Sequence, residues 1–156
     1  MKLSTRGQYA VMAMVDLAKH NDENHPTSLS AIAVRQDISL PYLEQLFSKL
    51  RRGELVKSVR GPQGGYFLAK PAEGIKVSEI IDAADEEINI AACAGADGIN
   101  CSKSSLCHTA SLWQALADHI DVFLQNITLE DLRDGKPIAN MFVPQNGADF
   151  TSAAKA

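Results

Sequence analysis

The sequence predicts a mainly α-helical protein with one small β-hairpin. Three observations lead to this fold class: two short amphipathic segments joined by a tight turn, a hairpin-like segment with a glycine-rich tip, and a long apolar stripe at helical spacing. They follow one another along 156 residues, a length that can bury a core of its own. We therefore expect a small N-terminal domain followed by a long helix.

Two helices are predicted first. Ser4 or Thr5 can cap a helix that runs to about His20. Its apolar face carries Val11, Met14, Val15 and Ala18. A second, shorter helix is predicted to begin after Ser28 and to end near Asp37, because a polar stretch separates it from the first.

A third helix is predicted after Ser39, which can cap it, with Pro41 in the first turn, where a missing N–H group is tolerated. Its apolar stripe consists of Leu40, Leu43, Leu46, Phe47 and Leu50. The polar side chains of this helix lie on its other faces. Two short helices joined by residues 37–39 are typical of a helix-turn-helix.

A β-hairpin is predicted next, with strands at residues 55–60 and 66–68 and a glycine-rich tip at residues 61–65. Glycines there permit close backbone approach and positive φ angles. A further helix follows, with apolar positions Val77, Ile80, Ile81 and Ala84. A hairpin directly after a helix-turn-helix is typical of a winged helix-turn-helix domain, which we assign to residues 1–88.

The rest of the chain is predicted in three parts. Residues 89–107 lack periodicity and are expected to form a loop. Residues 106–133 are expected to form a long helix and a short terminal helix, which a capping box of Thr128 and Asp131 opens. Residues 134–156 lose the pattern and are predicted to be a flexible tail.

Charge divides the chain into a basic and an acidic half. Residues 1–70 hold ten Lys and Arg against six Asp and Glu, whereas residues 71–156 hold five against thirteen. The basic half, at net +4, can neutralise phosphates and release counterions. No apolar run could span a bilayer and no signal-peptide core is present, so we expect a cytosolic protein without membrane contact.

The polar face of the third helix and the hairpin tip form the candidate DNA interface. Such a helix fits the major groove, where Gln45 can pair with an adenine edge and Tyr42 can bond a phosphate. Arg60 at the hairpin can reach the backbone or the minor groove. The predicted DNA-binding residues are Ser39, Tyr42, Glu44, Gln45, Arg51, Arg60, Gly61 and Gly64. The alternative is a helical bundle whose polar face is merely solvated, which the basic residues around Arg60 disfavour.

Glu44 is an acidic residue on this otherwise basic face. Phosphates repel a carboxylate that faces DNA unless it accepts a hydrogen bond from a cytosine amino group. The alternative is a surface ion pair with Arg51, which would contribute little. Both interpretations of Glu44 stay open at this point.

Three cysteines, Cys93, Cys101 and Cys107, lie within fifteen residues, and His108 follows the last of them. An odd number cannot pair fully within one chain, and a reducing compartment disfavours disulfides. Clustered thiolates in a loop suit an iron–sulfur cluster. Zinc is the alternative metal, although structural zinc favours closely spaced cysteine pairs that are absent here. Ordinary buried cysteines are the third interpretation.

Taken together, these residues resemble the Rrf2 family of bacterial transcription regulators, and most closely its members that bind an iron–sulfur cluster. The resemblance covers roughly residues 1–133. The matching stretches include Ser39-Leu40-x-Tyr42-Leu43-Glu44-Gln45-Leu46-Phe47, Val59-Arg60-Gly61-Pro62-x-Gly64-Gly65-Tyr66, and Leu112-Trp113 followed by Asn126-Ile127-Thr128-Leu129.

The resemblance implies a homodimer paired through the long helix, with one recognition helix and one wing on each half of a palindromic promoter site. It further implies a [2Fe–2S] cluster on Cys93, Cys101 and Cys107. Repression or activation of iron–sulfur assembly or iron-homeostasis genes would be the output.

Two departures from the family pattern affect the cluster. Seven residues separate Cys93 from Cys101 where the family has five, which leaves [4Fe–4S] as an alternative. Ala110 stands where a histidine is the fourth ligand. His108 is the candidate replacement, and Gln8, solvent, a small thiol or a side chain of the partner subunit are others.

No catalytic role is expected. Our hypothesis is that cluster occupancy redirects Glu44, so that a second class of DNA sites becomes readable. The alternatives from other classes are an electron-transfer protein that uses the same cysteines and a zinc-stapled DNA-binding module.

Overall fold

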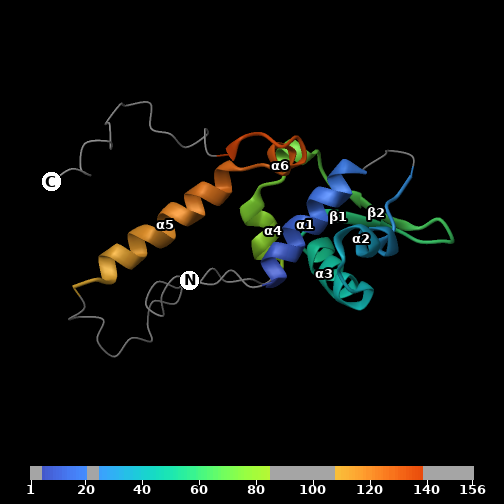
Figure 1. Cartoon of the computed structure of the whole chain (residues 1–156), viewed down its shortest axis with the longest axis horizontal. Helices are drawn as coiled ribbons and strands as arrows, with labels where there is room; N and C mark the ends of the chain where they lie inside the picture. Colours follow the sequence, from blue (N-terminus) through green and yellow to red (C-terminus); the bar gives the residue numbers. More distant parts are fainter. Residues whose placement is uncertain (1–4, 21–24, 85–107, 139–156) are drawn as a thin grey trace.

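The computed structural model describes residues 5–20, 25–84 and 108–138. Its elements are α1 (Thr5–Lys19), α2 (Leu29–Gln36), α3 (Leu40–Arg52), β1 (Val56–Val59), β2 (Gly65–Leu68), the 3₁₀ helix η1 (Ala72–Gly74), α4 (Val77–Ala83), α5 (Ala110–Asn126) and α6 (Leu129–Arg133). Figure 1 shows α1 to α4 and the hairpin gathered in one body, from which α5 projects. This arrangement confirms the predicted fold class.

Helix α1 is the centre of the body and packs against α2, α4, α6 and β2. Met14 and Leu17 are fully buried on it. Two members of the predicted stripe, Val11 and Val15, are only partly buried at its edges. Because several elements cover α1, its buried surface is wider than one stripe and includes the charged Asp16.

The helix-turn-helix consists of α2 and α3. The Ser28 hydroxyl caps α2 by accepting from the Ala31 N–H at 3.2 Å. Helix α2 ends at Asp37, which has the left-handed φ of 53° that lets the chain turn into α3. Four residues of the predicted α3 stripe are buried, namely Leu43, Leu46, Phe47 and Leu50.

Two details of α3 differ from the prediction. Ser39 occupies the N-cap position, but its side chain makes no capping hydrogen bond. Leu40, predicted in the buried stripe, is 38% exposed, since it is the first residue of the helix and lies at the corner of the helix-turn-helix. The first turn of α3 is therefore held by packing further along the helix rather than by its cap.

The wing is the antiparallel pair β1 and β2, in which Val56 faces Leu68 and Val59 faces Gly65. A third segment joins it: the N–H of Thr27 donates to the Tyr66 carbonyl at 3.0 Å, and the Tyr66 N–H donates to the Thr27 carbonyl at 2.8 Å. The predicted hairpin is confirmed. Its attachment to the chain before α2 is a long-range contact that no local pattern predicts.

The C-terminal elements are joined to the body by a second short bridge. The Val77 N–H donates to the Ile127 carbonyl at 3.0 Å, and the Leu129 N–H donates to the Ile75 carbonyl at 2.8 Å. The predicted capping box opens α6, with the Asp131 N–H donating to the Thr128 hydroxyl at 3.1 Å. These bonds fix the junction of α5 and α6 against η1 and α4.

Helix α5 packs against α4 and has no buried residue along its 17 residues. Large apolar side chains are exposed on it, namely Leu112, Leu116, Val122 and Phe123. None of the described helices is long and apolar enough to cross a bilayer. The predicted loop at residues 89–107 and the tail from residue 139 onward lie outside the described residues.

Candidate nucleic-acid interface

The outward face of α3 presents polar side chains to solvent. Ser39, Glu44 and Gln45 are exposed. Tyr42 is half-buried, because its ring lies edge-on against Tyr9 of α1, with ring centroids 5.8 Å apart. A packed ring is restricted to few orientations, so Tyr42 joins the exposed face of α3 to the central helix.

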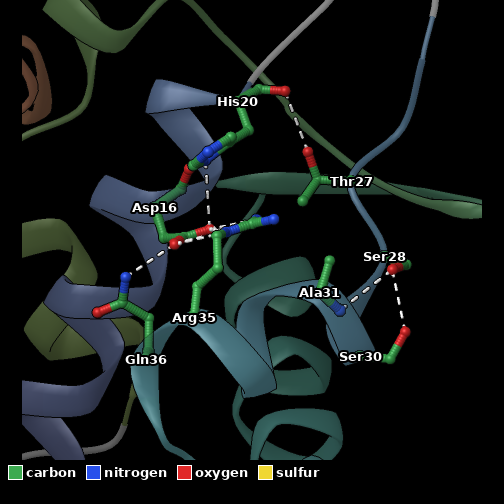
Figure 2. A network of polar contacts seen from close by, with 8 residues as sticks. All are labelled: Asp16, His20, Thr27, Ser28, Ser30, Ala31, Arg35 and Gln36. Atoms are coloured by element: carbon green, nitrogen blue, oxygen red, sulfur yellow. Dashed lines mark hydrogen bonds and ion pairs between the residues drawn. The ribbon is translucent and has the colours of Figure 1, made fainter.

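A buried ion pair fixes the first helix of the motif onto α1. Figure 2 shows Arg35 and Gln36 of α2 meeting the Asp16 carboxylate. Arg35 Nε donates to both carboxylate oxygens at 3.0 and 3.1 Å, and Gln36 Nε2 donates to Oδ2 at 2.7 Å. Burial works to raise the pKa of Asp16, but the hydrogen bonds from Arg35 and Gln36 hold it below its usual value. Asp16 is therefore ionised at neutral pH, and the network sets the angle of α2.

A second contact fixes the wing relative to α3. The rings of Phe47 and Tyr66 pack edge-on, with centroids 4.9 Å apart. The Arg51 guanidinium also donates to the Ser58 hydroxyl at 3.4 Å. Helix α3 and the wing are thus positioned as one unit.

The wing tip exposes Arg60 and is shaped by glycines. Gly61 has a φ of +124°, which an L side chain rarely adopts. A Cβ on Gly65 would lie 2.5 Å from the Thr27 carbonyl oxygen, so this position requires glycine for close approach. The expectation of positive φ is wrong for Gly64 and Gly65; there, closeness of backbone to backbone demands glycine.

Positive charge gathers where α3 ends and the wing begins. Lys49, Arg51 and Arg52 occupy the last turn of α3, where the helix dipole favours cations. Glu44 and Arg51 form no ion pair with each other, because Arg51 is directed to Ser58 instead. Glu44 therefore remains an exposed carboxylate on a basic face.

The candidate cluster ligands are divided by the limits of the described chain. Cys93, Cys101 and Cys107 lie outside the described residues. His108 is exposed and comes two residues before α5 begins at Ala110. Within the described ranges, no group of three or more His, Cys, Asp or Glu side chains could hold a metal ion.

Sequence reasoning missed the residues that hold this interface in place. Asp16 and Arg35 are nineteen positions apart and belong to different helices. The available signal was an acidic residue between Met14 and Leu17, within an apolar stretch of α1. A charge in such a place indicates a buried partner.

Comparisons with known proteins agree with this geometry. The Rrf2 family model, described as an iron-dependent transcriptional regulator, matches residues 3–135. The regulator IscR of Pectobacterium carotovorum is 48% identical over 141 residues, covering 90% of this chain and 84% of that protein. IscR of Yersinia pseudotuberculosis is 46% identical over 146 residues, covering 94% and 87%.

Solved structures share the fold. The structure of T. potens IscR has a TM-score of 0.68 and 40% identity, covering 92% of this chain and 94% of that one. CymR, described as the global cysteine regulator of B. subtilis, has a TM-score of 0.68 and 34% identity, covering 88% and 99%. The chain thus resembles DNA-binding regulators along most of its length.

Proposed function

This chain belongs to the Rrf2 family of DNA-binding transcription regulators, and on that basis we propose that it reads palindromic promoter sites as a homodimer and reports cellular iron–sulfur status. It would act in the cytoplasm, where bacterial DNA lies. The matched regulators are not enzymes, which agrees with the expected absence of a catalytic role.

The observation that carries the DNA-binding proposal is the exposed polar face of α3, a helix that packs against the wing. In this proposal Ser39, Gln45 and Tyr42 contact bases and phosphates of the major groove. Arg60, with Gly61 and Gly64 shaping the tip, contacts the backbone or the minor groove. The buried contacts of Asp16 and Phe47 support this role, because they hold both elements rigidly.

The DNA-binding proposal is tested by measuring affinity for promoter duplexes against salt concentration. We expect a steep negative slope of log affinity against log salt, and a weaker complex for Arg60→Ala. The control is Arg133→Ala, which removes an arginine of α6 that is ion-paired with Glu130 and Asp134. A slope near zero would show that phosphate neutralisation does not drive binding.

A second copy of this chain is the proposed partner of α5. The helix is about 25 Å long at 1.5 Å per residue, with no buried residue and several exposed apolar side chains. Pairing of two such helices would bury this surface and give the two-fold symmetry that palindromic sites require. Leu116→Asp should yield monomers in sedimentation experiments. Ser111→Asp, at another exposed position on α5, should leave the dimer intact.

We propose that Cys93, Cys101 and Cys107 hold an iron–sulfur cluster, with [2Fe–2S] favoured over [4Fe–4S]. The chemistry of the donor set supports this, because three thiolates lie within fifteen residues. The occupancy of such a cluster would depend on the supply of iron and on oxidants, and it would give the protein a cluster-bound and a cluster-free form. His108 is the candidate fourth ligand, since it is exposed and adjacent to Cys107.

The cluster proposal is tested by anaerobic purification with visible absorption and analysis of iron, sulfide and zinc. Alanine at each cysteine should remove the colour and the iron. His108→Ala should alter the spectrum, whereas His119→Ala should not, because His119 bonds the Ala115 carbonyl within α5. A colourless protein with stoichiometric zinc would instead establish the zinc-stapled alternative.

Communication between the two sites is proposed to pass through the ends of α3 and α4. Helix α4 ends at Ala83 and Ala84, directly before the segment that carries the cysteines. A Cβ on Gly53 would lie 2.9 Å from the Ala83 Cβ, so α4 touches the end of α3 there. A shift of this contact would turn α3 and redirect Glu44, and a coupling of about 1–3 kcal/mol would suffice.

A further inference from the structure

An open cavity of about 640 Å³ lies at the base of the wing. Arg51 enters it from the last turn of α3, Lys57 and Ser58 from β1, and Lys70 from the chain after β2. Glu54 is the one carboxylate among the lining residues, and none of them is aromatic. The cavity therefore offers charge and hydroxyl groups but no surface on which a base could stack.

The cations of the cavity differ in how they are engaged. Lys70 is paired with Glu79 at 2.7 Å, and Arg51 is directed by its bond to Ser58 at 3.4 Å. Lys57 is exposed, and its side chain makes no hydrogen bond or ion pair with another described residue. The cavity thus has two oriented cations in its wall and one ammonium group available to a ligand.

The cavity lies on the same hairpin as the wing tip. Lys57 and Arg60 are three residues apart on β1 and its extension, a separation of about 10 Å in an extended strand. Arg51 connects the cavity to α3. The cavity is therefore bounded by α3 and by the wing, the two elements that the proposed function assigns to DNA binding.

We propose that the cavity at the base of the wing receives a backbone phosphate of the bound duplex, with Lys57 as its contact. This inference rests on the proposed DNA-binding function and adds to it a contact outside the base-reading face of α3. Such a contact adds affinity equally for all sequences, because a phosphate carries no base information. Arg51 and Ser58 position the cavity wall.

The test compares Lys57→Gln with Lys19→Gln. Both variants remove one exposed lysine, but Lys19 is the last residue of α1 and does not line the cavity. Affinity is measured by fluorescence anisotropy for a promoter duplex and a scrambled duplex across a range of salt. Circular dichroism spectra verify that both variants are folded.

We expect Lys57→Gln to lower the affinity for both duplexes by the same factor and to reduce the slope of log affinity against log salt by about 1. Lys19→Gln should bind both duplexes as the wild type does. The ratio of wild-type affinity to Lys57→Gln affinity should therefore fall about 3.5-fold between 50 and 200 mM salt. This factor follows from the release of about 0.9 counterions per neutralised phosphate. A slope identical to that of the wild type would overturn the proposal, as would a loss confined to the promoter duplex.

A second experiment uses the unmodified protein. Duplexes that carry one neutral methylphosphonate linkage are compared at successive positions. At one position the neutral linkage should lower the affinity of the wild type and leave the affinity of Lys57→Gln unchanged. If no position discriminates between the two proteins, the cavity binds at most free anions and the proposal is wrong. The proposed function is judged separately, on whether the wild type binds the promoter duplex and Arg60→Ala binds it more weakly.

Discussion

Arg35 Nη2 lies 2.5 Å from Asp16 Oδ1, and the Asp16 side chain is only 2% exposed. This pair joins the first helix of the helix-turn-helix to the central helix of the body. His20 Nδ1 also lies 3.5 Å from the same carboxylate oxygen. The orientation of α2, and through it that of α3, thus depends on a charge pair between α1 and α2 that is remote from the candidate DNA-binding residues.

The first prediction is that Asp16→Asn lowers the free energy of unfolding by about 2–3 kcal/mol. The substitution removes the buried carboxylate charge that accepts hydrogen bonds from Arg35 and Gln36. Urea unfolding measures the change. Asp118→Asn, on the exposed surface of α5, is the matched control and should stay within about 0.5 kcal/mol of the wild type. Equal stability of both variants would mean that the pair contributes nothing beyond a surface interaction.

The second prediction concerns acid. The pKa of Asp131 is lowered by hydrogen bonds from Lys136 and Thr128, and that of Asp16 by Arg35 and Gln36 against the effect of burial. A depressed carboxyl pKa stabilises the fold above the unfolded value and loses that contribution as pH falls toward the folded value. The free energy of unfolding should therefore decline below about pH 4. Asp131→Asn should flatten this decline; an unchanged pH profile would contradict the assignment.

The third prediction compares two glycines. Gly65→Ala places a Cβ against the Thr27 carbonyl and should cost about 1–3 kcal/mol while detaching the wing. Gly74→Ala meets nothing nearer than the Lys70 side chain at 4.0 Å and should be neutral or slightly stabilising. Thermal unfolding and DNA affinity are measured for both. Similar losses for the two variants would show that the approach of Gly65 to Thr27 is not essential.

The elements that could be predicted from the sequence are those marked by a local pattern, either an apolar repeat or a capping motif. The stripe from Leu43 to Leu50 predicts α3, and Thr128 with Asp131 predicts the start of α6, because both depend on neighbours in the chain. The prediction that Leu40 is buried was wrong, because periodicity does not reveal what covers the end of a helix. The 3₁₀ helix η1 was missed, since a single turn has no repeat.

The support of the candidate site could not be predicted in the same way. The pairs Asp16–Arg35 and Thr27–Tyr66 join residues that are distant in sequence, and only the packed fold brings them together. The exposed residues Gln45 and Arg60 were identified because polar positions on an amphipathic helix and at a turn face solvent. The roles of these two residues and of the cysteines stay predictions.

The fourth prediction concerns Glu44. If its carboxylate bars some sites in the cluster-free protein, Glu44→Ala should let that protein bind sites otherwise reserved for the cluster-bound form. Sites open to both forms should change little, because relief of repulsion helps only where the carboxylate meets a phosphate or an unfavourable base edge. Equal changes on both classes of site would make Glu44 an ordinary surface residue.

The central claim is that the cysteine segment controls the DNA-reading face of α3 and the wing. The most direct measurement is the affinity for one promoter duplex at fixed salt, before and after anaerobic removal of iron from the same preparation. We predict a change of about 5- to 150-fold, which corresponds to the coupling of two sites. The change should vanish in Cys101→Ala, while Arg60→Ala lowers both affinities. Identical affinities of the iron-loaded and iron-free wild type would contradict the account.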